Sequence, residues 1–357
     1  MAKKKPAADS KSATTRSLRS QLARLDRQLA DSVAERAELV RQLAERKPEE
    51  DPSPTAVESG SGAVADDAMQ AVFREVVAAS RASIQRQRIA YLGPEDSFSH
   101  LTAIARFGEA SDLTPVSTIG AVFEEVSSGG CELGVVPLEN STHGRVTDTL
   151  EAFADSEVQI CGEAPMRIHH CLLGLGPRSA IKHVHSKPQA LSQCSHWLAE
   201  HLPGAEQHAA ASTSGSAQLA ANDASIAAIA SEQAGRRHGL QVLARNIEDQ
   251  HDNITRFAVI GLQSAPKTGD DKTALMFEVA HEPGSLADTM AIFKRQKLNM
   301  TWIESFPIPG SRGRYLFFIE FQGHQTELRA RRAIASLEKK CLRLRVLGSY
   351  ARTEALG

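Results

Sequence analysis

The chain has 357 residues, of which 41% are hydrophobic and 24% are charged, and its formal net charge is −2 at pH 7. This length fits two or three globular domains. A net charge near zero argues against nucleic acid as a partner, because proteins that bind it usually carry a basic surplus. The basic N-terminus lacks the apolar core of a signal peptide, and no apolar run is long enough to span a membrane, so we expect no membrane partner and a cytoplasmic location.

Metal and cofactor signatures are missing from the sequence. The five cysteines include no CxxC pair, which disfavours a zinc site or a disulfide framework and fits a reducing compartment. His183 and His185 have the spacing to share one face of a strand, but without a third ligand we expect no metal there. No glycine-rich nucleotide-binding motif is present either. The sequence therefore predicts no metal and no cofactor.

The N-terminal region is predicted to be helical. Residues 1–14 read as a disordered tail, and a long helix is expected over 15–47, followed by a Pro/Ser/Gly-rich linker (48–66) and a second helix over 67–85. Arg36 interrupts the apolar stripe of the first helix. A cation in such a position either extends to water or binds an anion, and both interpretations remain open. The apolar stripe of that helix consists of Leu18, Leu22, Leu25, Leu29, Val33, Val40 and Leu43.

The rest of the chain divides into two domains. Over 88–262, short apolar strands alternate with helical segments, a pattern typical of an α/β domain with a mainly parallel sheet. A second linker (263–271) follows. Residues 272–352 then read in the order βαββαβ, which is a ferredoxin-like unit.

Polar residues follow several of the predicted strands in the α/β domain. Small hydroxyl and amide side chains at helix starts bind anions, although each one alone is equally an ordinary helix cap. Together they predict a cleft suited to a small dicarboxylate. Thr255 offers a hydrogen-bond donor there, and Arg256 either pairs with a ligand carboxylate or begins a strand and pairs with Asp249 or Asp252. The segments concerned are Gly93–Ser99, Gly134–Val146, Ser186–Cys194, Ser212–Ser214 and Asn253–Phe257.

Four of these segments, GPEDSFS, GVVPLENSTHGRV, SKPQALSQC and NITRF, resemble the motifs of the prephenate dehydratase family. The C-terminal unit is similar to the ACT regulatory domain of that family, with Phe306 where the family has Arg. The predicted N-terminal helices resemble the first and third helices of a chorismate mutase domain, whose second helix is absent. The resemblance implies an α/β fold with a two-subdomain, periplasmic-binding-protein-like dehydratase domain beside these helical and ACT regions.

The resemblance also implies an activity and a set of site residues. The expected activity is the conversion of prephenate to phenylpyruvate by a homodimer or tetramer, with phenylalanine as the allosteric ligand. Thr255 is implied as the catalytic residue. The implied substrate-binding residues are Ser99, Asn140, Ser141, Gln189, Thr213, Arg256 and Phe257; the implied phenylalanine-binding residues are Gly284, Ser285, Leu286, Glu304 and Ser305; and a remnant of the mutase site is implied at Arg19, Arg36 and Lys47.

Two alternatives stay open on the sequence. One is a bifunctional enzyme with residual chorismate mutase activity. The other is a non-catalytic protein that binds or senses a small anion.

Overall fold

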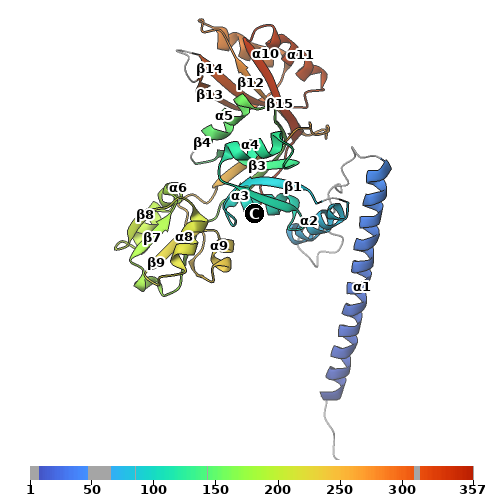
Figure 1. The fold of residues 1–357 in the computed structure, drawn as a ribbon, viewed down its shortest axis with the longest axis vertical. Helices are drawn as coiled ribbons and strands as arrows, with labels where there is room; N and C mark the ends of the chain where they lie inside the picture. The colour runs from blue at the N-terminus through green and yellow to red at the C-terminus, as the bar shows by residue number, and fades with distance from the viewer. Residues whose placement is uncertain (1–7, 47–65, 85, 143, 309–313, 357) are drawn as a thin grey trace, which may run out of the picture. The chain divides into compact units, whose positions relative to one another are not determined.

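The computed structural model describes residues 8–46, 66–84, 86–142, 144–308 and 314–356. These residues belong to two compact units, Met1–Gln87 with Phe107–Asp112, and Arg88–Arg106 with Leu113–Gly357 (Figure 1). Among the described residues, no helix combines the length and the apolar character that crossing a membrane requires.

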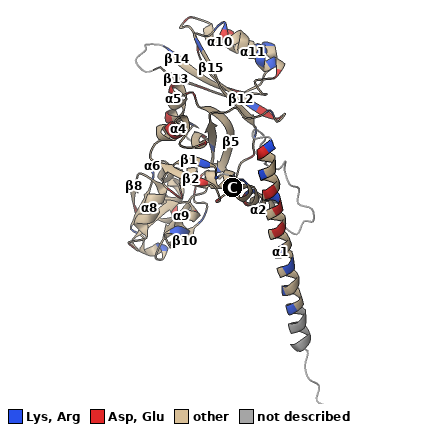
Figure 2. Ribbon diagram, turned by 45° about the vertical axis from the view of Figure 1, so that its right-hand side comes forward, with Lys and Arg blue, Asp and Glu red and all other residues tan. Residues whose placement is uncertain are grey.

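Two helices form the body of the first unit, α1 (Ala8–Arg46) and α2 (Asp66–Ala82), and they contact each other. The helix α1 begins before the predicted start, so the expectation of a disordered tail does not hold from Ala8 onward, whereas residues 1–7 and the linker at 48–65 lie outside the described residues. Charges of both signs alternate along α1 (Figure 2). Leu18, Leu22, Leu25 and Leu29 are 50–65% exposed, so the N-terminal half of the predicted stripe has no cover in the single chain.

The first sheet of the second unit has the strand order β2-β1-β3-β11-β5, and β4 pairs with β3. Its strands are β1 (Arg88–Leu92), β2 (Asp112–Val116), β3 (Leu133–Asn140), β4 (Gly144–Arg145), β5 (Gln159–Arg167) and β11 (Ile254–Gly261). The helices of this part are α3 (Phe98–Phe107), α4 (Ile119–Ser127) and α5 (Thr147–Asp155).

The second sheet has the order β10-β6-β9-β7-β8. Its strands are β6 (Cys171–Gly174), β7 (His183–Ser186), β8 (Glu206–Ala209), β9 (Ile226–Ala230) and β10 (Gln241–Ala244). The accompanying helices are η1 (Arg178–Ala180), α6 (Pro188–Gln193), α7 (Ser195–His201), α8 (Thr213–Ala220) and α9 (Glu232–Arg237). Continuous apolar strands such as β6 and β9 are buried along their whole length or nearly so, as predicted.

Both sheets are mixed, which corrects the prediction of a mainly parallel sheet. The strand β3 runs parallel to β1, but β11 is antiparallel to both β3 and β5. The reason is the path of the chain: it leaves the first sheet after β5, builds the second sheet, and returns as β11 between β3 and β5.

The C-terminal part of the second unit, called the C-terminal unit below, runs from Asp271 to Ala351. It has the predicted βαββαβ order and an antiparallel sheet, β13-β14-β12-β15. Its elements are β12 (Asp271–Glu278), α10 (Ser285–Gln296), β13 (Met300–Pro307), β14 (Tyr315–Gln322), α11 (Leu328–Glu338) and β15 (Arg343–Ala351). Helices α10 and α11 lie on one face of this sheet (Figure 1). Phe277 and Ile319 of the sheet pack with residues of these helices. On the other face, Met276, Phe318 and Tyr350 share a core cluster with side chains of the first sheet.

Candidate active site

A cavity of about 270 Å³ is lined by residues from both halves of the α/β domain, namely from the first sheet and its loops and from helices and loops beside the second sheet. Six of the predicted site residues line it, namely Ser99, Asn140, Gln189, Thr213, Thr255 and Phe257. Several of the other lining residues are apolar, among them Leu92, Phe98, Ile119, Val146 and Ile168. The cavity thus combines a few convergent polar groups with an apolar wall, as small-molecule sites do.

Asn140, the last residue of β3, holds the hydroxyl of Thr255 on β11. The register of the two strands sets these residues opposite each other. Nδ2 of Asn140 donates to Oγ1 of Thr255 at 2.8 Å and to Oδ1 of Asn253 at 2.9 Å. The orientation of the amide is fixed because its Oδ1 accepts from the backbone N–H of Thr142 at 3.1 Å. Thr255 is therefore an acceptor toward Asn140, which leaves its own hydroxyl hydrogen for a ligand.

A directional chain of hydrogen bonds runs from Asn140 to His170. The hydroxyl of Thr142 donates to Asn140 Oδ1 at 2.6 Å and accepts from Gln193 Nε2 at 2.7 Å. Because the nitrogen of Gln193 is a donor, its Oε1 accepts from His170 Nε2 at 2.9 Å. His170 therefore carries its hydrogen on Nε2, and its buried Nδ1 keeps a lone pair with no hydrogen-bond partner among the described residues. His170 is also among the residues that line the cavity.

The surroundings of His170 favour the neutral imidazole. Burial lowers its pKa, and this effect outweighs the opposing influence of Gln193 and Glu248. The carboxylate of Glu248 accepts from the backbone N–H of His170 at 2.8 Å and contacts Nδ1 of His169 at 2.8 Å. His169 is 44% exposed, in keeping with the alternation of side chains along an extended segment.

His170 belongs to one of two segments that connect the sheets, 168–170 and 245–253. The two connections are hydrogen-bonded to each other, by Ile168 N to Asn253 O at 2.8 Å and by Ile247 N to His170 O at 3.0 Å. The polar chain that ends at Thr255 therefore lies where a hinge between the two halves would bend.

The N-terminus of α8 and the loop after β1 form another wall. Ser212 caps α8 by accepting from Gly215 N, and Thr213 is the first residue of the helix. Ser214 Oγ donates to the carbonyl of Glu95 at 2.8 Å. Arg237 pairs with Glu95 and Asp96, which accounts for the acidic character of this loop. These contacts join the two halves of the α/β domain on one side of the cavity.

Ser141 does not line the cavity, although it was predicted to bind substrate. Its hydroxyl donates to the carbonyl of Asp252 at 3.2 Å and accepts from the backbone N–H of Ile254 at 3.0 Å. These bonds fasten the end of β3 to the start of β11, so the role its contacts indicate is structural.

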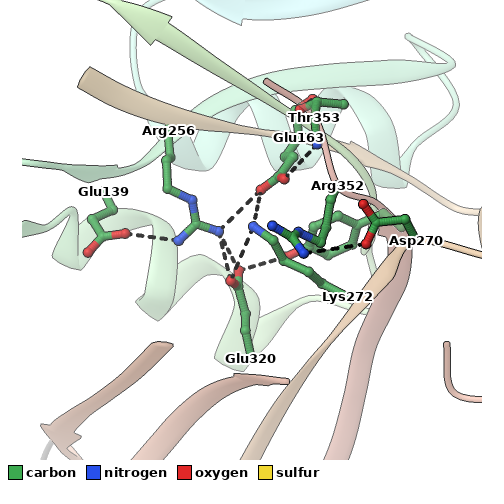
Figure 3. A network of polar contacts seen from close by, with 9 residues as sticks. Glu139, Glu163, Arg256, Asp270, Lys272, Glu320, Arg352 and Thr353 are labelled. Atoms are coloured by element: carbon green, nitrogen blue, oxygen red, sulfur yellow. Dashed lines mark hydrogen bonds and ion pairs between the residues drawn. The ribbon is translucent and has the colours of Figure 1, made fainter. Parts of the chain in front are cut away.

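Arg256 is also placed differently from the prediction. It follows Thr255 on β11, where successive side chains alternate between faces, and it is absent from the cavity lining. Its guanidinium contacts Glu139 at 2.9 Å, Glu163 at 3.4 Å and Glu320 of β14 at 2.7 Å (Figure 3). Neither Asp249 nor Asp252, the partners weighed from sequence, is among these contacts. The guanidinium of Arg256 is paired with three carboxylates of the protein. We therefore exclude Arg256 from the residues that bind the ligand.

Lys187 is the sole Lys or Arg among the described residues that line the cavity, and it stands at the N-cap position of α6. Sequence reasoning did not single out Lys187, His170, Thr142 or Gln193 as site residues. The signal was nevertheless present for three of them, because Thr142 lies within the motif segment Gly134–Val146 and Lys187 and Gln193 lie within Ser186–Cys194.

The predicted phenylalanine-binding residues lie in two places on the C-terminal unit. Ser285 and Leu286 line a cavity of about 140 Å³ at the start of α10, and Gly284 precedes it with φ +86°, a conformation that favours glycine. Glu304 and Ser305 are on the edge strand β13 and are absent from this cavity. Glu304 instead pairs with Arg145 of β4 at 2.8 Å.

The predicted mutase remnant is spread along α1. Arg19 is exposed, Arg36 is half-buried, and Lys47 lies outside the described residues. Burial and the nearby Arg81 lower the pKa of Arg36. Since a helix rises about 1.5 Å per residue, Arg19 and Arg36 lie roughly 25 Å apart along α1. Within a single chain the two residues therefore cannot both bind the same small ligand.

Comparison with known proteins decides the family. Residues 89–265 match the family model described as prephenate dehydratase. The bifunctional chorismate mutase/prephenate dehydratase of Stutzerimonas stutzeri is 34% identical over 354 residues, covering 94% of this chain and 97% of that protein. The chain belongs to the prephenate dehydratase family. The resemblance predicted from the four motifs is thereby confirmed.

Solved structures agree with membership of the prephenate dehydratase family. The prephenate dehydratase of Arthrobacter aurescens, in complex with L-Phe, is 33% identical and aligns with a TM-score of 0.70 over 75% of this chain and 92% of that one. A structure described as a quorum-quenching acylase is 28% identical and aligns with a TM-score of 0.68 over 75% of this chain and 98% of that one. The predicted fold class, a two-subdomain α/β domain preceded by an N-terminal helical region and followed by an ACT-like domain, is confirmed.

Proposed function

We propose that this cavity binds prephenate and that the chain converts it to phenylpyruvate, carbon dioxide and water. The observation that carries the proposal is the bond from Asn140 Nδ2 to Thr255 Oγ1 at 2.8 Å, because it directs the free hydroxyl hydrogen of Thr255 toward a ligand. A leaving hydroxyl needs such a donor.

The reaction requires little covalent chemistry from the protein. The bond to the ring carboxylate breaks, its electron pair enters the ring, and the opposite carbon–oxygen bond breaks with the electron pair leaving on oxygen. The departing hydroxide takes up one proton, so the products are an aromatic ring, carbon dioxide and water. Thr255 is too weak an acid to lose its proton outright, and its contribution is a hydrogen bond that strengthens as negative charge develops on the leaving oxygen. The proton comes ultimately from solvent.

His170 complements Thr255 in this scheme. The leaving hydroxyl has one hydrogen to donate and lone pairs that accept. Nδ1 of His170 accepts the hydrogen of the leaving hydroxyl. A lone pair on the oxygen of that hydroxyl then faces the Thr255 hydroxyl, which donates to it. The neutral imidazole suits this role, since a protonated one would have no acceptor to offer.

The two carboxylates of prephenate are held mainly by polar groups without charge. Lys187 offers one cation, and Gln189, Ser99 and Thr213 offer neutral donors, with Thr213 at the N-terminus of α8. The apolar wall that includes Phe257 and Val146 contacts the ring and the carboxylate that leaves, which is poorly hydrated there. Weak hydration favours the loss of carbon dioxide because the neutral product needs no solvation.

Phenylalanine regulates the enzyme in this proposal through the C-terminal unit. Ser285 and Leu286 form one half of the site, and Glu304 and Ser305 of a second copy form the other half. The contacts of Arg145 with Glu304 and of Arg256 with Glu320 link this unit to β4 and β11. A ligand that shifts the sheet would thereby shift the strand that carries Thr255. Such couplings are usually worth about 1–3 kcal/mol.

We further propose a homodimer, in the cytoplasm, whose subunits cover the exposed leucines of α1. The exposed leucines form an apolar stripe on a helix that is otherwise charged, and packing against a second copy of the same helix would bury this stripe. Chorismate mutase activity is the alternative that the N-terminal region leaves open, and it requires that the second copy bring its own cations beside Arg19 or Arg36.

Two assays on the purified full-length chain test these proposals. Phenylpyruvate formation from prephenate, and its inhibition by phenylalanine, are the expected results. Prephenate formation from chorismate, measured separately, would reveal residual mutase activity. A chain that binds prephenate without forming phenylpyruvate would contradict the proposed activity and favour a binding or sensing role.

A further inference from the structure

A cluster of histidines lies on the second sheet, outside the active-site cavity. The strands β7 and β8 run parallel, and their register sets His183 opposite Glu206 and His185 opposite His208. Because alternate residues of a strand share a face, all four side chains lie on the same face of this strand pair. Three of these residues, His183, Glu206 and His208, have side-chain ligand atoms that all lie within 4.8 Å of one another. Within the part of the chain that the structure describes, this is the one such group of three His, Cys, Asp or Glu residues.

The distances in this cluster match those around a metal ion. Nδ1 of His183 and Nε2 of His208 are 3.1 Å apart, and Oε2 of Glu206 is 3.5 Å from each of them. Three ligand atoms bound at about 2.0–2.1 Å in a tetrahedral arrangement lie roughly 3.3–3.4 Å from one another. We propose that His183, Glu206 and His208 bind one divalent transition-metal cation of the zinc class.

The chemistry of the three ligands selects this class of cation. Two imidazole nitrogens and one carboxylate suit Zn²⁺, whereas Mg²⁺ and Ca²⁺ prefer oxygen ligands alone. All three side chains are partly exposed, at 37%, 72% and 41%, so the ion can enter and a solvent molecule can take the fourth position.

The fourth member of the cluster, His185, packs against one of the proposed ligands. The ring of His185 stacks on that of His208, with centroids 4.6 Å apart and an interplanar angle of 19°.

The place of this site in the sheet indicates what the metal does. The strand β8 is at the edge of the sheet, and the cation ties it to β7. Lys187 follows β7 directly, and Ser212 follows β8 after two residues, so the braced pair carries one wall of the cavity. The sequence alone did not predict this site, because the missing ligands come from the next strand, more than twenty residues further along. The inference does not depend on the proposed activity.

Zinc titration of the untagged full-length chain, after treatment with a chelator, tests the proposal. A chromogenic zinc indicator serves as the competitor. We expect one Zn²⁺ per chain and a rise in thermal midpoint when Zn²⁺ is added. His183→Gln and His208→Gln should each weaken binding by at least about tenfold, because each removes a ligand.

A matched control is His201→Gln, which changes another partly exposed histidine that stacks on Trp197. It should bind zinc as the wild type does. Thermal midpoints of all variants in the presence of chelator establish that they fold alike. The proposal is overturned if the wild type takes up no zinc in competition with the indicator, or if the double variant of His183 and His208 retains wild-type stoichiometry and affinity.

Discussion

Arg256 holds both carboxylate oxygens of Glu320 through its Nη2, at 2.7 and 2.8 Å (Figure 3). Burial opposes the charge on Arg256, but Glu320, Tyr350 and Glu163 outweigh burial and raise the pKa of the guanidinium. Glu320 also accepts from the hydroxyl of Tyr350 at 2.6 Å. A residue adjacent to the proposed catalytic threonine is thus fixed by the sheet of the C-terminal unit.

Replacing Glu320 by Gln should destabilise the protein by about 3 kcal/mol, because it leaves a buried guanidinium without its nearest counter-charge. The expected result is a lower midpoint in urea unfolding. The control is Asp270→Asn, since the pair of Asp270 with Arg352 is exposed and such pairs contribute about 0–1 kcal/mol. Equal stability of Glu320→Gln and wild type would contradict this account of the network.

Phe306 has a structural explanation that differs from a ligand role. It is 3% exposed and stacks on Phe318, with centroids 5.6 Å apart, inside the core that the C-terminal unit shares with the first sheet. Phe306→Arg should therefore cost more than about 4 kcal/mol, through lost packing and a buried charge. Leu262→Arg, at a side chain that is 55% exposed, should change stability little. Urea midpoints compare the two, and similar values would show that Phe306 does not pack as described.

The contrast between Thr255 and Arg256 shows where sequence reasoning succeeds. Motif spacing predicted that Ser99, Asn140, Gln189 and Thr255 belong to one site, and all four line the same cavity. The antiparallel β11 begins at the edge where β3 ends, so Thr255 lies opposite Asn140. Motif spacing misplaced Arg256, since a motif does not say toward which face of a strand each residue points. It also missed His170, whose importance depends on a chain of hydrogen bonds through Gln193 that forms only in the folded protein.

His170→Gln should lower kcat for phenylpyruvate formation by roughly 10–100-fold, the loss expected for one hydrogen bond to the reacting group. The glutamine amide nitrogen replaces the donor at Nε2 and so preserves the bond to Gln193, while the acceptor at Nδ1 is lost. Steady-state kinetics measure the effect. An unchanged kcat would remove His170 from the mechanism.

The same histidine predicts a pH dependence of stability. Its folded-state pKa is lowered below the usual value of about 6.5 by burial, so the unfolded chain binds a proton that the folded chain does not. The contribution of the neutral His170 to the free energy of unfolding is complete above about pH 6.5. It is lost as the pH falls through the lowered folded-state pKa. Urea unfolding at a series of pH values from about 7.5 to 5 should show a smaller decline in His170→Gln than in the wild type. If the free energy of unfolding declined equally with falling pH in both proteins, the imidazole of His170 would not be held neutral.

The kinetics of Thr255→Val and Thr255→Ser test the central claim most directly, since valine preserves the shape of the side chain and removes its donor, whereas serine keeps the donor. The account predicts that Thr255→Val binds prephenate with little change in affinity but loses about 10²–10⁴-fold in kcat, while Thr255→Ser retains most of the rate. Wild-type kcat in Thr255→Val would contradict the assignment of Thr255 as the hydrogen-bond donor to the leaving hydroxyl.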